Sequence, residues 1–215
     1  MIKERFAKNV DAFILRHVPA VTRIPLSPDQ LTLLGVGISL VAGIAFALGW
    51  VRTGGLLMIL SGIPDLIDGI IARHRGTAST AGAFFDSTMD RVSDLLIFSG
   101  IAVGMAAARD PWGAALACWA LSGSVVTSYA RARAEVELGD LSVGIMERAE
   151  RFIVLVAFSI FGFLALGLWI VAIFSTITCW QRITTAMSLL RSGDHSRPAR
   201  LRLVESPDPV EATDV

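Results

Sequence analysis

Long apolar stretches dominate the chain and predict six membrane-spanning helices, at residues 31–50, 56–73, 83–107, 112–132, 152–166 and 168–183. Most of them reach the length of about 20 residues at which a helix crosses roughly 30 Å of hydrocarbon. Residues 1–20 differ, because charged positions interrupt a helical stripe of apolar ones, which predicts an amphipathic helix lying in the membrane interface. Residues 192–215 are polar without such a stripe, and we expect a disordered cytoplasmic tail there. The six-span domain is accordingly placed at residues 21–191.

Composition supports the same fold class, since 53% of the residues are hydrophobic and only 18% are charged. These values indicate a one-domain, all-α integral membrane protein and exclude a soluble globule. The net charge is zero, but with the N-terminus inside, the outer loops hold only Arg52 and Arg109 among the basic residues. The bias of basic residues toward inner loops predicts a multi-pass protein of the cell (inner) membrane, with both termini in the cytoplasm.

Five aspartates, Asp65, Asp68, Asp86, Asp90 and Asp94, lie inside stretches that otherwise predict membrane spans. A charged residue at the centre of a span costs about 2.5–3.5 kcal/mol, so we expect none of them to face lipid. The first two are three residues apart and the other three follow at intervals of four, so each set shares one face of its helix. The short connection at residues 74–81 then aims both acidic faces at one cavity.

Carboxylates that face one another need cations to offset their repulsion. Magnesium in proteins is commonly held by a few carboxylates together with substrate phosphates. Two such ions can stabilise both the attacking and the leaving oxygen of a displacement at phosphorus. The residues therefore predict a two-metal site, with a set of buried ion pairs as the alternative. For Asp94 alone, an ion pair with Arg91 and a supporting role beside the metals stay equally open.

The aspartates also stand in a longer pattern, Asp65-x-x-Asp68-Gly69-x-x-Ala72-Arg73, eight residues, then Gly82-x-x-x-Asp86-x-x-x-Asp90. This pattern resembles the complete signature of the CDP-alcohol phosphatidyltransferases. The resemblance implies an intramembrane site with two Mg²⁺ ions, or Mn²⁺, at which a CDP-linked lipid gives its phosphatidyl group to an alcohol and releases CMP. It further implies that the metal ligands are Asp65, Asp68, Asp86 and Asp90, and that Asp90 is also the general base.

A segment before the first span, Leu26-Ser27-Pro28-Asp29-Gln30-Leu31-Thr32, is similar to the one that contacts the nucleotide in this family. Without the resemblance it predicts only a helix start, with Ser27 as the cap and Pro28 in the first turn. Gly69 is small enough for a pyrophosphate to approach the helix, and Arg73 offers a fork of donors to a phosphate. The CDP-lipid residues that the resemblance implies are Asp29, Gln30, Leu31, Thr32, Gly69, Arg73 and Ser79.

Five arginines, Arg131, Arg133, Arg148, Arg151 and Arg182, lie at the inner ends of the last three spans. Membrane orientation alone explains any one of them. Together they favour an acceptor that carries a phosphate, because a neutral alcohol needs no such charge. Their surroundings, Tyr-x-Arg-Ala-Arg-Ala-Glu, Glu-Arg-x-Glu-Arg and Cys-x-Gln-Arg, resemble bacterial phosphatidylinositol phosphate synthases, which implies that these arginines bind the phosphate of an inositol phosphate.

The expected reaction in phospholipid biosynthesis is therefore transfer from CDP-diacylglycerol to an inositol phosphate. The family implies a homodimer, and no nucleic-acid partner is expected. The nearest alternative is the same chemistry with glycerol 3-phosphate as acceptor. A prenyltransferase needs more spans than this chain supplies. A divalent-cation transporter would not explain why Gly69, Ala72, Arg73 and Gly82 occupy their positions in the pattern.

Overall fold

The computed structural model describes residues 25–139, 141 and 143–191, and all regular elements in these ranges are α-helices. They are α2 (Pro28–Ala47), α3 (Val51–His74), α4 (Thr80–Ala107), α5 (Pro111–Leu138), α6 (Arg148–Ile160) and α7 (Leu164–Arg191). The prediction of an all-α chain is confirmed for this part of the protein, with one helix for each apolar stretch. The interfacial helix expected at residues 1–20 and the tail expected at 192–215 lie outside the described residues.

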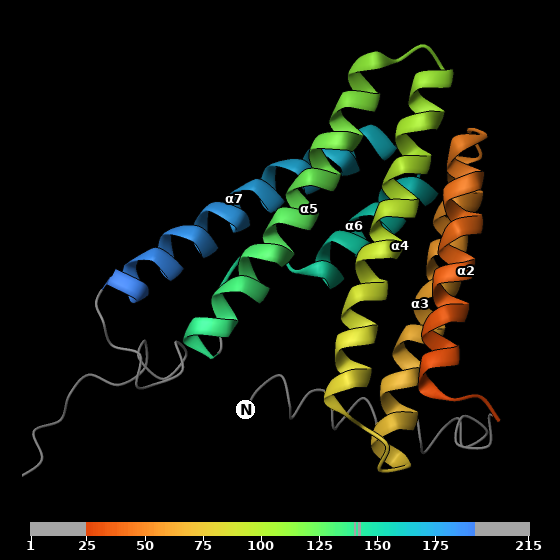
Figure 1. Ribbon diagram of the computed structural model, residues 1–215. Helices are drawn as coiled ribbons and strands as arrows, with labels where there is room; N and C mark the ends of the chain where they lie inside the picture. Colours follow the sequence, from red (N-terminus) through yellow and green to blue (C-terminus); the bar gives the residue numbers. More distant parts are fainter. Residues whose placement is uncertain (1–24, 140, 142, 192–215) are drawn as a thin grey trace, which may run out of the picture.

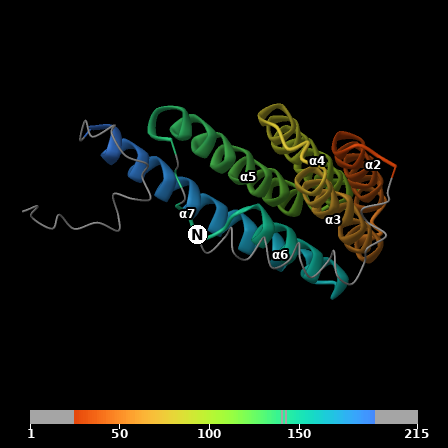
Figure 2. The ribbon, with the colours of Figure 1, turned by 90° about the horizontal axis from the view of Figure 1, so that it is seen from below.

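The helices form a bundle in which each packs mainly against two others, in the spatial order α2, α3, α6, α7, α5, α4 and back to α2 (Figure 2). All six contribute to one apolar core that includes Phe46, Met58, Ile101, Leu155 and Leu168. Figure 1 shows that α5 and α7 diverge from α2, α3 and α4 toward the end at which α3 stops and α4 starts. Apart from Arg52, the charged residues of α3 and α4 are found toward that end.

Local signals set most helix ends. At the start of α2, Ser27 Oγ accepts a hydrogen bond from Gln30 N at 3.3 Å and Ser27 N donates to Gln30 Oε1 at 2.9 Å, which is a capping box. The expected helix end at residue 166 is wrong. Gly162 has a φ of +82°, which glycine adopts without a steric cost, so the chain turns after Ile160 and α7 begins at Leu164.

Three helices, α2, α3 and α7, are long and apolar enough to cross a membrane by length and composition. Apolar helices of this kind characterise a membrane-embedded protein. α4 and α5 have 28 residues each but carry several charges in the halves that diverge. α6 has 13 residues and rises only about 20 Å, which is shorter than the roughly 30 Å of a bilayer's hydrocarbon core.

Glycines bring α2 and α4 into backbone contact. A Cβ atom added to Gly43 would lie 2.5 Å from the carbonyl oxygen of Leu96, and one added to Gly100 would collide with the backbone of Gly43. Small residues four positions apart allow this close approach between helices in membranes.

We expect Gly100→Val to lower the thermal unfolding temperature of the protein in detergent, because overpacking at a tight contact costs roughly 1–3 kcal/mol. The matched control is Gly37→Val in α2, where an added Cβ meets nothing within 4 Å. Equal shifts for the two variants would show that the backbone contact does not contribute to stability.

Candidate active site

Three of the predicted metal ligands meet between α3 and α4. Asp65, Asp68 and Asp86 each have a carboxylate oxygen that lies within 4.8 Å of the other two. Thr32 Oγ1 donates to Asp68 Oδ2 at 2.6 Å and fixes that carboxylate. Asp86 Oδ1 is buried with no hydrogen-bond partner among the described residues. Three carboxylates, one of which has an unsatisfied oxygen, fit a divalent cation.

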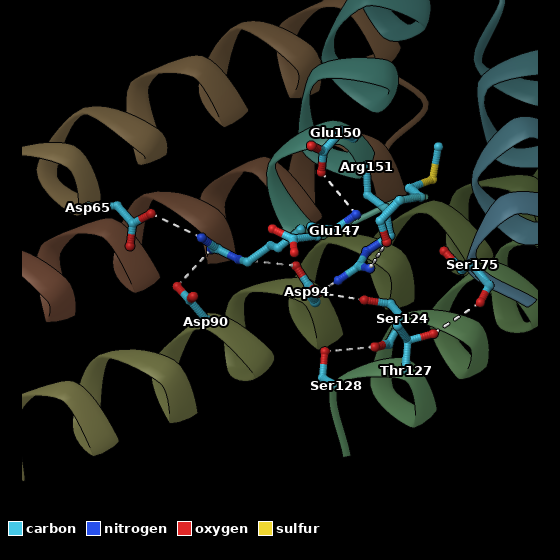
Figure 3. A network of polar contacts seen from close by, with 12 residues as sticks. Asp65, Asp90, Asp94, Ser124, Thr127, Ser128, Glu147, Glu150, Arg151 and Ser175 are labelled. Carbon is cyan, nitrogen blue, oxygen red and sulfur yellow. Dashed lines mark hydrogen bonds and ion pairs between the residues drawn. The ribbon is translucent and has the colours of Figure 1, made fainter. Parts of the chain in front are cut away.

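The fourth predicted ligand, Asp90, lies outside this cluster and contacts an arginine instead. Arg148, in the first turn of α6, has Nη2 at 2.9 Å from Asp90 Oδ1 and Nη1 at 3.0 Å from Asp65 Oδ2. Figure 3 shows Asp65 and Asp90 pointing toward each other across this guanidinium. The guanidinium of Arg148 therefore bridges the acidic faces of α3 and α4.

Asp94 continues the acidic face of α4 toward the arginines. Ser124 Oγ donates to Asp94 Oδ2 at 2.7 Å, and the same oxygen lies 4.0 Å from Nη2 of Arg151 (Figure 3). Its other oxygen is 3.9 Å from Nε of Arg148. Among the described residues, Asp94 forms ion pairs with these two arginines, so the geometry favours a supporting role over the alternative pair with Arg91.

A cavity of about 1240 Å³ lies beside these groups and is bordered by residues of all six helices. It exceeds the roughly 300–1,000 Å³ typical of small-molecule sites. Its charged lining comprises Asp65, Asp90, Asp94, Arg91, Arg131, Glu135, Glu147, Arg148, Arg151 and Arg182. The acidic groups nearest the metal cluster come from α3 and α4, whereas four of the five arginines come from α5, α6 and α7. The cavity can therefore hold a diphosphate next to the carboxylates and a second anion next to the arginines.

The side chains of the two arginines near the end of α5 lie on opposite faces of the helix. Arg131 lines the cavity, donates from Nε to Glu135 Oε1 at 2.7 Å and lies 3.8 Å from Glu147. Arg133 has a side chain that is 57% exposed, pairs with Glu137 at 2.9 Å, and is not among the described residues that line the cavity. Residues two positions apart on a helix lie on nearly opposite faces, so only one of the pair can point inward. The structure thus brings four of the five predicted acceptor arginines together and leaves Arg133 apart.

Arg182 of α7 is buried against backbone carbonyl groups. Its Nε donates to Val143 O at 2.7 Å and its Nη1 to Thr127 O at 2.9 Å. One turn earlier, Thr178 Oγ1 accepts from Met146 N at 3.0 Å. Together they tie the connection between α5 and α6 to α7, and so they position the first turn of α6.

We expect Arg182→Ala to lower the thermal unfolding temperature, since the carbonyl of Val143 loses its donor and a buried carbonyl without a donor costs about 1–3 kcal/mol. The acceptor requirement should rise as well, because the loop that positions Arg148 loses its anchor. Arg191→Ala, at the exposed last turn of the same helix, is the control. A changed acceptor requirement with unchanged stability would assign Arg182 to direct phosphate binding alone.

Local contacts explain part of the predicted CDP-lipid site. Leu31 is buried, whereas Asp29 and Gln30 are exposed at the start of α2, where the side chain of Gln30 completes the capping box. Ser79 caps α4 by accepting from Gly82 N at 3.1 Å. A Cβ atom on Gly69 would lie 3.2 Å from Nη1 of Arg73, so the missing side chain leaves room for that guanidinium. Thr32 lies directly against a metal-site carboxylate. All seven residues thus lie in α2, in α3 or at the cap of α4.

Arg91 lines the cavity, although the sequence motifs did not assign it to a substrate. It directly follows Asp90, and its Nη1 is buried without a hydrogen-bond partner among the described residues. The signal was available, because an arginine inside an expected span is as costly as an aspartate. The sequence had suggested it only as a partner for Asp94.

Comparison with known proteins adds three findings. Residues 26–187 match the family described as CDP-alcohol phosphatidyltransferase. The archaetidylinositol phosphate synthase of Pyrococcus horikoshii is 38% identical over 169 residues, which cover 78% of this chain and 87% of that protein. The phosphatidylinositol phosphate synthase of Cutibacterium acnes is 37% identical over 179 residues, which cover 80% and 86% respectively.

A solved structure is also similar. The crystal structure of Mycobacterium tuberculosis phosphatidylinositol phosphate synthase with CDP-DAG bound matches with a TM-score of 0.71 and 30% identity, covering 85% of this chain and 94% of that one. The same enzyme in complex with manganese and citrate matches with a TM-score of 0.71 and 32% identity, covering 84% and 88%. A protein of similar fold therefore binds a divalent metal, in agreement with the carboxylate cluster found here.

Proposed function

The chain belongs to the CDP-alcohol phosphatidyltransferase family, and from this premise we propose that it transfers the phosphatidyl group of CDP-diacylglycerol to an inositol phosphate, giving phosphatidylinositol phosphate and CMP. As a member of this family it is an enzyme, which removes the transporter alternative. One observation carries the proposal: a cluster of three carboxylates adjoins a cavity that five arginines line. The names of the relatives support an inositol phosphate as the acceptor.

The metal ligands of the proposal are Asp65, Asp68, Asp86 and Asp90, holding two Mg²⁺ ions, with Mn²⁺ as a substitute. When bound, the ions neutralise charge on the diphosphate and on the departing CMP. The unsatisfied oxygen of Asp86 and the repulsion within the cluster support cation binding at these residues.

In the proposed reaction, Asp90 accepts the proton of the acceptor hydroxyl. The hydroxyl oxygen forms a bond to the phosphorus that carries the diacylglycerol, and the bond from that phosphorus to the CMP oxygen breaks. The CDP-lipid is bound by Asp29, Gln30, Leu31, Thr32, Gly69, Arg73 and Ser79. The acceptor phosphate is bound by Arg131, Arg148, Arg151 and Arg182, with Arg91 added by the geometry of the cavity.

The proposal includes lateral entry of the lipid substrate from the inner leaflet. Leu66, Phe84 and Ile153 line the cavity, yet each is more than half exposed on the outer surface of the bundle. An opening of this kind lets acyl chains stay in the bilayer while the headgroup reaches the carboxylates. We further propose that all six helices cross the cell membrane, that both termini and the cavity face the cytoplasm, and that the enzyme is a homodimer.

The deciding experiment measures CMP release from CDP-diacylglycerol by the purified enzyme with Mg²⁺, offering inositol phosphate, glycerol 3-phosphate, inositol and serine in parallel. We expect release with inositol phosphate to exceed that with the other three. Release with glycerol 3-phosphate instead would keep the chemistry and replace the acceptor. Equal release with inositol and inositol phosphate would contradict the role given to the arginines.

A further inference from the structure

Arg148 occupies the space that the proposed reaction needs in front of Asp90. The carboxylate of Asp90 is only 15% exposed, and the guanidinium lies 2.9 Å from one of its oxygens. An acceptor hydroxyl must come within hydrogen-bond reach, about 2.6–3.2 Å, of the base that takes its proton. The guanidinium stands at that distance and excludes the hydroxyl from this oxygen.

A substrate phosphate competes with these carboxylates for the same guanidinium. Both of its terminal nitrogens are engaged, one with Asp65 and one with Asp90, and its Nε faces Asp94. A bidentate arginine–phosphate pair needs two parallel donors from one side of the fork. A phosphate that binds Arg148 through both terminal nitrogens therefore competes with Asp65 and Asp90 for these donors.

The surroundings favour this exchange only for an anionic acceptor. Arg91, Arg131, Arg151 and Arg182 line the same cavity, so a phosphate has partners there before it reaches Arg148. A phosphate carries about −1.5 to −2 charges and competes with two carboxylates for one guanidinium. Water and a neutral alcohol carry no charge with which to compete.

We propose that Arg148 shields Asp90 until the phosphate of the acceptor draws its guanidinium away, so that this arginine selects phosphorylated acceptors and suppresses attack by water on the CDP-lipid. The inference rests on the proposed function. In the suppressed reaction, the oxygen of water bonds to the phosphorus that carries diacylglycerol, the bond to the CMP oxygen breaks, and the proton passes to Asp90. The products are phosphatidic acid and CMP.

Arg148 also competes with a cation, since Asp65 and Asp90 are both proposed metal ligands. An acceptor phosphate that withdraws the guanidinium should therefore tighten metal binding, and by linkage the metal should tighten acceptor binding. A phosphate-binding arginine without the shielding role would produce no such coupling through Asp90.

The first test compares Arg148→Met with the wild type and with Arg191→Met, an exposed control in α7. CMP release is measured with no acceptor, with inositol and with inositol phosphate. We expect release with inositol phosphate to fall about tenfold or more, the effect of losing a charge-assisted hydrogen bond. Release without acceptor should rise by about tenfold, a part of what a positioned base contributes. If release with inositol phosphate falls and release without acceptor does not rise, the proposal is overturned.

The second test needs no turnover. Mn²⁺ binding is measured by electron paramagnetic resonance without CDP-lipid, in the presence and absence of inositol phosphate. Wild type should bind Mn²⁺ about fivefold or more tightly when inositol phosphate is added. Arg148→Met should bind it tightly in both conditions, and Arg148→Gln replaces that variant if it is not monodisperse. Equal affinities in the wild type and the variant without phosphate would contradict shielding.

These readouts separate the two proposals. The acceptor-free release and the acceptor-free Mn²⁺ affinity do not depend on which alcohol the enzyme uses. If the enzyme prefers glycerol 3-phosphate as the acceptor, the proposed function fails. The acceptor-free CMP release and the acceptor-free Mn²⁺ affinity still test whether Arg148 shields Asp90.

Discussion

Asp90→Asn is expected to lower CMP release with saturating substrates by about 10²–10⁴-fold, the usual contribution of a positioned general base. The amide keeps the size of the side chain but accepts no proton. Arg148 keeps its contact with Asp65 at 3.0 Å and lies 3.9 Å from Asp94, so the bridge between α3, α4 and α6 should survive. The measurement is the initial rate with CDP-diacylglycerol, inositol phosphate and Mg²⁺.

The matched control is Asp94→Asn, one helical turn further along the same face of α4. Asp94 holds Arg151 and Ser124 rather than the reacting hydroxyl, so its substitution should raise the acceptor requirement more than it lowers the maximal rate. Mn²⁺ should still bind Asp90→Asn, because Asp65, Asp68 and Asp86 remain together. A wild-type rate in Asp90→Asn would remove Asp90 from the role of base.

The hydrophobic pattern was sufficient to predict the helices, because a spanning segment must satisfy its backbone hydrogen bonds internally and only a helix does so within one segment. It did not predict where the last two helices are divided. Residues 152–166 are apolar apart from Ser159, and the conformation of Gly162 separates α6 from α7. A single glycine in an apolar stretch is ambiguous, since it also occurs within membrane helices, as Gly167 does here.

The aspartate positions were predictable because helical spacing fixes which side chains share a face. The same spacing argument separates Arg131 from Arg133, and applying it to these two would have predicted that only one points inward. The ion-pair partner of Asp90 could not be predicted from the sequence. Its contact with Arg148 depends on how α6 packs against α3 and α4, and the hydrogen bond that Arg148 makes to Asp65 joins residues 83 positions apart.

The hydrogen-bond partners of Arg182 could not be predicted from the sequence either. The sequence places it at the end of a helix, where either a phosphate or the membrane surface explains an arginine. Its two carbonyl partners belong to α5 and to the connection after it, and no pattern in the sequence indicates that this connection folds back against α7.

Asp86→Asn is expected to lower CMP release by at least about a thousandfold, since a metal supplies several kcal/mol of charge stabilisation and each 1.4 kcal/mol is a factor of ten. The substitution should lower activity without lowering the unfolding temperature of the metal-free protein. Oδ1 of Asp86 is buried without a hydrogen-bond partner among the described residues and lies in a cluster of like charges. Without metal, the neutral amide relieves repulsion, so the variant should unfold at a temperature equal to or above that of the wild type.

The measurement is thermal unfolding in detergent with EDTA and with Mn²⁺, because a ligand that binds only the folded state stabilises it. Wild type should be stabilised by Mn²⁺ and Asp86→Asn should not. Glu137→Gln, at an exposed carboxylate that pairs with Arg133, is the control and should respond to Mn²⁺ as the wild type does. Undiminished stabilisation of Asp86→Asn by Mn²⁺ would mean that the cation binds elsewhere, and the unsatisfied oxygen of Asp86 would then need a different partner, such as a donor group of the substrate.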